Sequence, residues 1–102
     1  MLELRPNCEL CDRDLPPAST EARICSYECT FCADCVNNVL SDVCPNCGGG
    51  FAPRPIRPAQ AWRPGTGLVH DPAWTERRRP KYTREEMVAF AERLSGVTPQ
   101  KR

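Results

Sequence analysis

The spacing of the cysteines constrains the fold of this chain more than any other sequence feature. All eight cysteines of the 102 residues fall between positions 8 and 47, and four steps in that run have the C-x2-C form. Two cysteines separated by two residues can form a tight turn in which both thiolates reach one tetrahedral metal ion. Four thiolates satisfy one zinc ion, so eight satisfy two with none left over. The predicted ligands are Cys8, Cys11, Cys25, Cys29, Cys32, Cys35, Cys44 and Cys47.

The setting of these cysteines favours metal over disulfides. A segment of about fifty residues buries too little apolar surface to fold without a staple. The polar start at residues 1–6 is too short for the apolar part of a secretory signal, and no run of about eighteen apolar residues could span a membrane. We therefore expect a reducing cytoplasm, where clustered cysteines bind metal.

Two pairing schemes are compatible with the spacing alone. A sequential scheme gives the first four cysteines to one ion and the last four to the other. An interleaved scheme ties both sites into one unit, which suits a module with little hydrophobic core, and we favour it. It assigns Cys8, Cys11, Cys32 and Cys35 to site 1, and Cys25, Cys29, Cys44 and Cys47 to site 2.

The order of the cysteine pairs resembles that of the RING finger and its cross-brace relatives. The segment Cys29-Thr30-Phe31-Cys32-Ala33-Asp34-Cys35 is similar to the middle of a RING, and Cys44-Pro45-Asn46-Cys47 is similar to its last ligand pair. The resemblance implies interleaved pairing, a small hairpin from residues 23–25 and 30–31, and a short helix whose apolar side is Val36, Val39 and Leu40.

The chain departs from ubiquitin-ligase RINGs at several positions. Cys29 stands where a common RING has histidine, and Leu10 fits the apolar position of the first ligand pair. The residues 36–38 after the sixth ligand include no aromatic, and Gly48-Gly49 follows the eighth ligand in place of a basic residue. A ubiquitin-ligase-like enzyme is therefore a distant alternative. The start at residues 1–9 and the run through Cys47 also resemble short bacterial cysteine-rich proteins of unknown function.

These features predict a small metal-stabilised α+β fold in three parts. Residues 1–50 form the cysteine module, with its short hairpin and short helix. Residues 51–82 are rich in proline and arginine and form a linker or docking arm, which Trp62 and Trp74 would help to dock. Residues 83–96 form an amphipathic helix.

The helix prediction depends on its ends and its periodicity. Thr83 is the expected N-cap, Glu86 completes a capping box, and Gly96 is the expected C-terminal cap. An apolar stripe at helical spacing favours packing on the module or on a second copy of the chain, with exposure to another protein as the alternative. The stripe consists of Met87, Phe90, Ala91 and Leu94.

The two halves of the chain carry opposite charge. Residues 1–50 hold three Arg against eight Asp and Glu, a net −5, and residues 51–102 hold eleven Lys and Arg against five acidic residues, a net +6. Each four-cysteine zinc site adds about −2 to the module. We expect the basic arm to neutralise the module. Contact of a nucleic acid with Arg77, Arg78, Arg79 and Lys81 is the alternative.

The sequence therefore favours a non-enzymatic module with two structural zinc ions that binds a protein partner. The single histidine, His70, has no nucleophile beside it in the sequence. Iron in an iron–sulfur or rubredoxin-like electron carrier is a further alternative, because Cys29-x2-Cys32-x2-Cys35 and Cys44-Pro45 are similar to ferredoxin ligand runs. The expected partner-contact residues are Leu10, Val36, Val39, Met87, Phe90 and Leu94.

Overall fold

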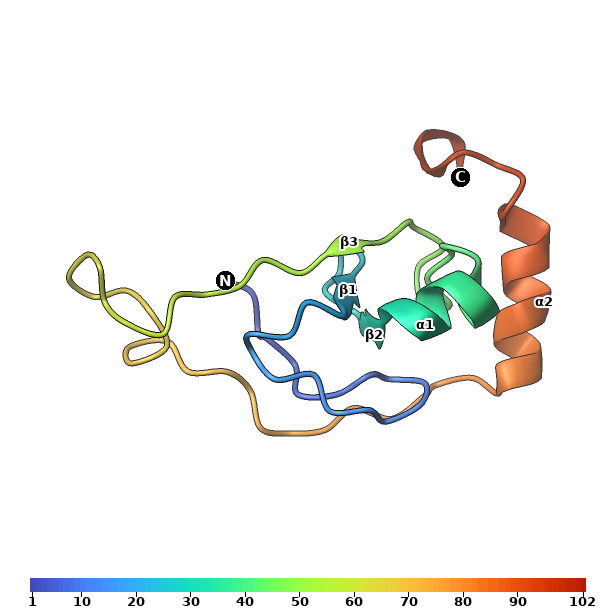
Figure 1. Cartoon of the computed structure of the whole chain (residues 1–102). Coiled ribbons are helices and arrows are strands. Elements are labelled where there is room, and N and C mark those ends of the chain that lie inside the picture. The colour runs from blue at the N-terminus through green and yellow to red at the C-terminus, as the bar shows by residue number, and fades with distance from the viewer.

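The cysteine-rich half folds into a hairpin followed by a short helix, which confirms the predicted α+β class. The computed structural model describes residues 1–102 (Figure 1). The elements in chain order are β1 (Ala22–Ile24), β2 (Thr30–Cys32), α1 (Ala33–Cys35), the π-helical turn η1 (Val36–Leu40), β3 (Ala52–Pro53), α2 (Arg84–Leu94) and the 3-10 turn η2 (Pro99–Lys101).

The three strands form one antiparallel sheet in the order β2-β1-β3. In the hairpin, Arg23 lies opposite Phe31 in register, and the connection contains Cys25 and Cys29. On the other edge of β1, Arg23 lies opposite Pro53. β3 thus extends the sheet beyond residue 50, where the module was expected to end.

The core is small and is built around the cysteines. Phe31, Leu15 and Leu40 are almost completely buried, in one cluster with six of the cysteines. The ring of Phe51 meets that of Phe31 edge-on, with centroids 5.5 Å apart and an interplanar angle of 78°. A buried side chain of this size contributes about 1.5–3 kcal/mol to the stability of the fold. Because the core has few such side chains, the fold depends on further cross-links.

The predicted C-terminal helix is present as α2, which begins and ends within the expected range. The Glu86 N–H donates to the Thr83 hydroxyl (3.1 Å), and the Thr83 N–H donates to the Glu86 carboxylate (3.0 Å), so the capping box is complete. The expected glycine cap is wrong. The cap residue is Ser95 in the right-handed region, and Gly96 is not among the glycines with positive φ.

The arm between β3 and α2 wraps around the module instead of packing as a separate unit. It leaves β3, makes a loop at the end of the molecule opposite α2, and returns beside the N-terminal segment (Figure 1). The Leu68 N–H closes the loop on the Pro58 carbonyl (2.8 Å). Trp62 remains 77% exposed, so it does not dock the arm. Trp74 is partly covered and lies 5.4 Å from the Arg78 guanidinium. No helix in the structure is both long enough and apolar enough to cross a bilayer.

Candidate metal centres

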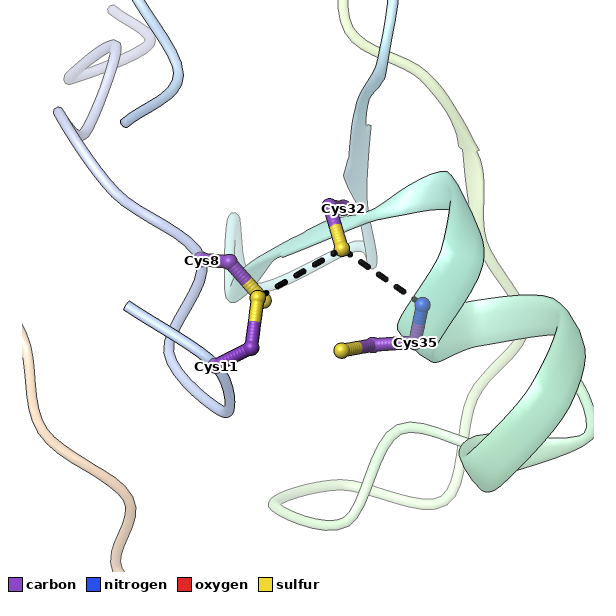
Figure 2. A group of neighbouring side chains, drawn as sticks. All are labelled: Cys8, Cys11, Cys32 and Cys35. Atoms are coloured by element: carbon purple, nitrogen blue, oxygen red, sulfur yellow. Dashed lines mark hydrogen bonds between the residues drawn. The ribbon is translucent and has the colours of Figure 1, made fainter. Parts of the chain in front are cut away.

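Four cysteine side chains from two separate parts of the chain point toward one another (Figure 2). The Sγ atoms of Cys8, Cys11, Cys32 and Cys35 all lie within 4.8 Å of one another. The Sγ atoms of Cys11 and Cys32 are 3.7 Å apart. This is close to the edge of about 3.8 Å expected for a tetrahedron with zinc–sulfur bonds of about 2.3 Å. Donor type and spacing therefore fit a closed tetrahedral metal ion.

A tight turn places the first two of these thiols. The Cys8 N–H donates to the Arg13 carbonyl (2.8 Å), and the Asp12 N–H donates to the Cys8 carbonyl (2.9 Å). Asp12 adopts the left-handed conformation with φ of 65°, a region that Asp and Asn enter more easily than most residues. The chain thus reverses directly after Cys11, and both thiols remain on the same side of the turn.

The junction between β2 and α1 places the other two thiols. Cys32 is the last residue of β2 and the N-cap of α1, and Cys35 is the last residue of α1. The Cys35 N–H donates to the Cys32 Sγ (3.5 Å), so the thiol takes the role that a Ser or Asp side chain has at other helix starts. The change from strand to helix brings the two side chains to the same ion position.

The second group is less regular than the first. The Sγ atoms of Cys25, Cys44 and Cys47 lie within 4.8 Å of one another, and Cys29 lies outside this limit. Cys25 and Cys29 flank the hairpin turn, where the Cys25 N–H donates to the Cys29 carbonyl (3.2 Å) and Glu28 is left-handed with φ of 67°. The three residues between Cys25 and Cys29 make a wider turn than a C-x2-C step.

Cys29 still interacts with the second group. The neighbouring thiols of Cys29 and Cys44 lower the pKa of Cys25 to about 3. The thiols of Cys25 and Cys29 in turn raise the pKa of Cys44. In the first group, burial and then the charges of neighbouring thiolates raise the pKa of Cys35. Since adjacent thiolates repel one another, neither group can ionise fully unless a cation balances it.

Backbone amides support the thiolates of both groups. The Tyr27 N–H donates to the Cys25 Sγ (3.3 Å), and the Gly49 N–H donates to the Cys47 Sγ (3.4 Å). Amide donors of this kind fix the orientation of a ligating side chain and spread the charge of the thiolate. The turn at residues 44–48, which we call the second knuckle, is closed by the Gly48 N–H, which donates to the Cys44 carbonyl (2.7 Å).

The thiols group in the interleaved order, not the sequential one. Cys8 and Cys11 meet Cys32 and Cys35, while Cys25 meets Cys44 and Cys47 across the intervening residues. Each group therefore ties the N-terminal part of the module to a later part. Two cysteine groups that could hold metal ions are thus present, and all eight cysteines lie in or beside them.

The expected partner-contact residues divide into two sets. Val36 and Met87 are 5% and 0% exposed and lie in the core of the chain itself, so in this conformation they cannot contact a partner. Leu10 and Val39 are half-buried and pack against the same core. Phe90 and Leu94 are also half-buried and face the module near Gly48. The apolar stripe of α2 thus faces the module, as favoured from the sequence.

The module forms ion pairs with part of the arginine run at residues 77–79. The Arg77 guanidinium forms ion pairs with Asp12 (2.8 Å) and Asp14 (2.7 Å), and Arg78 lies 3.7 Å from Glu3. Arg79 and Lys81 are exposed and form no hydrogen bond or ion pair. Both pairs of Arg77 are exposed, so water and salt screen the attraction between the charges. The basic arm and the acidic module are therefore in direct contact.

Sequence reasoning missed the role of the earlier arginines. Arg54 is 5% exposed and donates to the carbonyls of Arg5 (2.8 Å), Leu15 (3.1 Å) and Pro16 (2.9 Å). Arg57 donates to the carbonyls of Leu2 and Asp71. The only signal for these contacts was the alternation of arginine with proline, which reads equally well as a solvated linker.

The fold defines a small cross-braced protein with two cysteine groups that could hold metal ions. The chain belongs to the family described as Protein of unknown function (DUF1272), whose model matches residues 1–57 and thus includes all eight cysteines. An uncharacterized protein of Rhizobium meliloti (strain 1021) is 64% identical over 59 residues, which cover 58% of this chain and 70% of that relative. No solved structure matches the chain. The predicted kinship with short bacterial cysteine-rich proteins is therefore confirmed.

Proposed function

We propose that this protein is a non-enzymatic zinc module of RING-like cross-brace type that mediates protein–protein interaction or regulation in the cytoplasm. The observation that carries the proposal is the interleaved grouping of the cysteines. It uses the thiols to connect distant parts of a chain with a small core. Thiols arranged in this way act as structural ligands and leave the surface of the module for binding.

Zinc suits the donor set better than other metals. Closed sites made only of thiolates favour zinc or iron, and zinc needs no redox partner. When bound, zinc would neutralise part of the thiolate charge and hold the ligands of each group together. The first group would bind it through Cys8, Cys11, Cys32 and Cys35, and the second through Cys25, Cys44 and Cys47, with Cys29 as the fourth ligand.

A catalytic role has little support among the side chains. Every cysteine lies in or beside a metal group, so no free thiol remains as a nucleophile. His70, the single histidine, is exposed and lies in the loop of the arm. Its side chain forms no hydrogen bond, so the neighbouring Asp71 does not hold the imidazole in a fixed orientation.

Nucleic-acid binding is less well supported than protein binding. Arg77 and Arg78, which would form the centre of a phosphate-binding surface, face acidic side chains of the module. A polyanion would have to replace those partners. If it did, the observed affinity would fall steeply as salt increases, and changing Arg77, Arg78 and Arg79 to Ala would abolish it.

Metal analysis and partner capture together test the proposal. The purified full chain should contain two zinc ions per molecule and be colourless, whereas iron would give a coloured protein. Immobilised zinc-loaded chain should retain a protein partner that a Cys44→Ser variant does not retain. Equal retention by the two chains, or retention of nucleic acid alone, would contradict a zinc-dependent protein-interaction module.

A further inference from the structure

The N-terminal module carries a seat for a helix, and α2 occupies it. We use the term helix seat for the surface formed by η1 and the second knuckle, residues 44–48. α2 packs against η1 at one end of the molecule (Figure 1). Met87 of α2 is completely buried and joins the core cluster that contains Val36 and Leu40. The seat therefore accepts an apolar side chain deep into the module.

A glycine in the knuckle gives the rest of the helix room. Gly48 has φ of +81°, and a Cβ placed on it would lie 3.2 Å from Leu94 Cδ1 and 3.6 Å from Phe90 Cζ. The two side chains thus lie directly over bare backbone. Together with Met87 they form the i, i+3 and i+7 positions of an amphipathic helix, which is the pattern of a helix bound in a groove.

The seat and its occupant belong to different parts of the chain. Val36, Leu40 and Gly48 lie within residues 1–57, the part that matches the family. α2 lies outside it and follows a stretch of arm, residues 75–83, that contains no helix or strand. The helix seat thus lies within the region that matches the family, whereas α2, which covers the seat, comes from the segment that follows.

The attachment of α2 to the module is mainly apolar. No hydrogen bond joins the helix itself to residues 1–50. The polar attachments flank it: Arg78 pairs with Asn7 on one side, and on the other Arg102 donates to the carbonyls of Asp42 (3.0 Å) and Gly48 (3.1 Å). A helix held in this way can leave its seat while the rest of the arm stays bound.

α2 also fills its seat incompletely. A cavity of about 400 Å³ remains between the helix and the second knuckle. Pro45 and Asn46 line it from the module, and Tyr82, Ala89 and Phe90 line it from the C-terminal segment. Glu86, Met87 and Arg93 complete the lining. Ala89 is exposed at the rim, and its small side chain leaves the cavity open to solvent. A helix with a larger apolar residue at that position would therefore cover more of the cavity than α2 does.

We propose that α2 is a displaceable cover and that the helix seat binds an amphipathic helix of a protein partner, with a larger apolar residue at the position of Ala89. This inference rests on the proposed role in protein interaction and names the chemistry of the partner. The covalent tether gives α2 an effective concentration on the order of millimolar. A partner helix must therefore bind more tightly than α2, and filling the cavity is the means that the structure offers.

Fluorescent peptides of residues 80–97 test this in trans against the zinc-loaded full chain. The Met87→Asp chain, whose own helix cannot enter the seat, should bind the peptide at least tenfold more tightly than the wild-type chain does. An Arg84→Asp chain, which adds the same carboxylate on the exposed first turn, should behave like wild type. The Ala89→Leu peptide should bind about tenfold more tightly than the unchanged peptide, and a Met87→Asp peptide should not bind.

Zinc content identifies chains that have lost the fold. If the Met87→Asp chain contains fewer than two zinc ions, a Leu94→Asp chain replaces it, because Leu94 is half-buried and lies outside the core cluster. The proposal would be overturned if the Met87→Asp or Leu94→Asp chain bound the peptide no more tightly than the wild-type chain. It would also be overturned if no zinc-loaded chain bound the peptide. Zinc-dependent partner capture without peptide binding would refute only the helix seat, and peptide binding without capture would refute only the proposed function.

Discussion

Asn7 and Arg78, which are 71 positions apart in the chain, join the module and the arm through a pair of hydrogen bonds. The Asn7 side-chain amide donates to the Arg78 carbonyl (2.8 Å), and the Arg78 N–H donates to the Asn7 side-chain carbonyl (3.0 Å). Asn7 is 1% exposed, and its amide also donates to Asp12. The Asn7 side chain thus pairs with the backbone N–H and carbonyl of Arg78, as the backbone of a neighbouring strand would.

Replacing this amide should loosen the arm. We expect Asn7→Ala to lower the free energy of unfolding by about 1–3 kcal/mol, because it leaves buried backbone groups without partners. Hydrogen exchange should accelerate at the Arg78 amide. Asn38→Ala, at an exposed asparagine, is the matched control and should change neither quantity. Unchanged exchange at Arg78 in the Asn7→Ala chain would show that the pairing does not hold the arm.

Arg54 should be the most sensitive of the arginines. Its guanidinium is buried without a carboxylate partner, and burial lowers its pKa. Arg54→Ala would leave the carbonyls of Arg5, Leu15 and Pro16 without this donor, and we expect a loss of about 3 kcal/mol in urea denaturation of the zinc-loaded chain. Arg63→Ala, at an exposed arginine, should cost less than about 0.5 kcal/mol. Similar losses in the two variants would contradict the structural role of Arg54.

Two glycines form a matched pair for backbone strain. Gly48 has positive φ and lies under Leu94, whereas nothing lies within 4 Å of a Cβ placed on Gly96. Gly48→Ala should cost about 1–2 kcal/mol, because an L-residue is strained in the left-handed region, and it should also push on α2. Gly96→Ala should be neutral or slightly stabilising. Thermal unfolding compares the two variants. Equal unfolding midpoints would show that the helix seat does not require a residue without a side chain at position 48.

Cadmium substitution reads the grouping of the thiols directly. With ¹¹³Cd in both centres, one signal should couple to protons of Cys8, Cys11, Cys32 and Cys35. Cys32→Ser should shift or abolish that signal and leave the other in place, and Cys44→Ser should do the reverse. If Cys32→Ser instead disturbed the signal coupled to Cys44 and Cys47, the sequential pairing would be correct.

The sequence predicted the features that depend on local patterns. The capping box at Thr83 and Glu86 uses residues three apart, and the C-x2-C turns use the same distance, so each can be recognised without knowing the fold. The prediction of interleaved grouping depended on the small expected core and on the resemblance to RING fingers, since the spacing alone allowed both schemes. The apolar stripe of α2 indicated that one face would be covered, and the module covers it, with Met87 completely buried.

The features that were missed depend on long-range contacts. The three carbonyls that Arg54 contacts lie 38 to 49 positions away, and no local pattern marks them as acceptors. The wrong cap at Gly96 has a similar cause. The chain continues from Ser95 in right-handed conformation and turns toward η2, where Arg102 reaches the Asp42 carbonyl.

Two metal centres should create the fold of residues 1–50, and chelation during ¹⁵N-resolved NMR tests this dependence most directly. Each structural zinc can supply about 10 kcal/mol of folding free energy, more than the small core is able to replace. We expect two zinc ions per chain, loss of dispersed amide signals from the module as a chelator removes them, and recovery when zinc is added back. A metal-free chain that keeps its dispersed spectrum would contradict the claim.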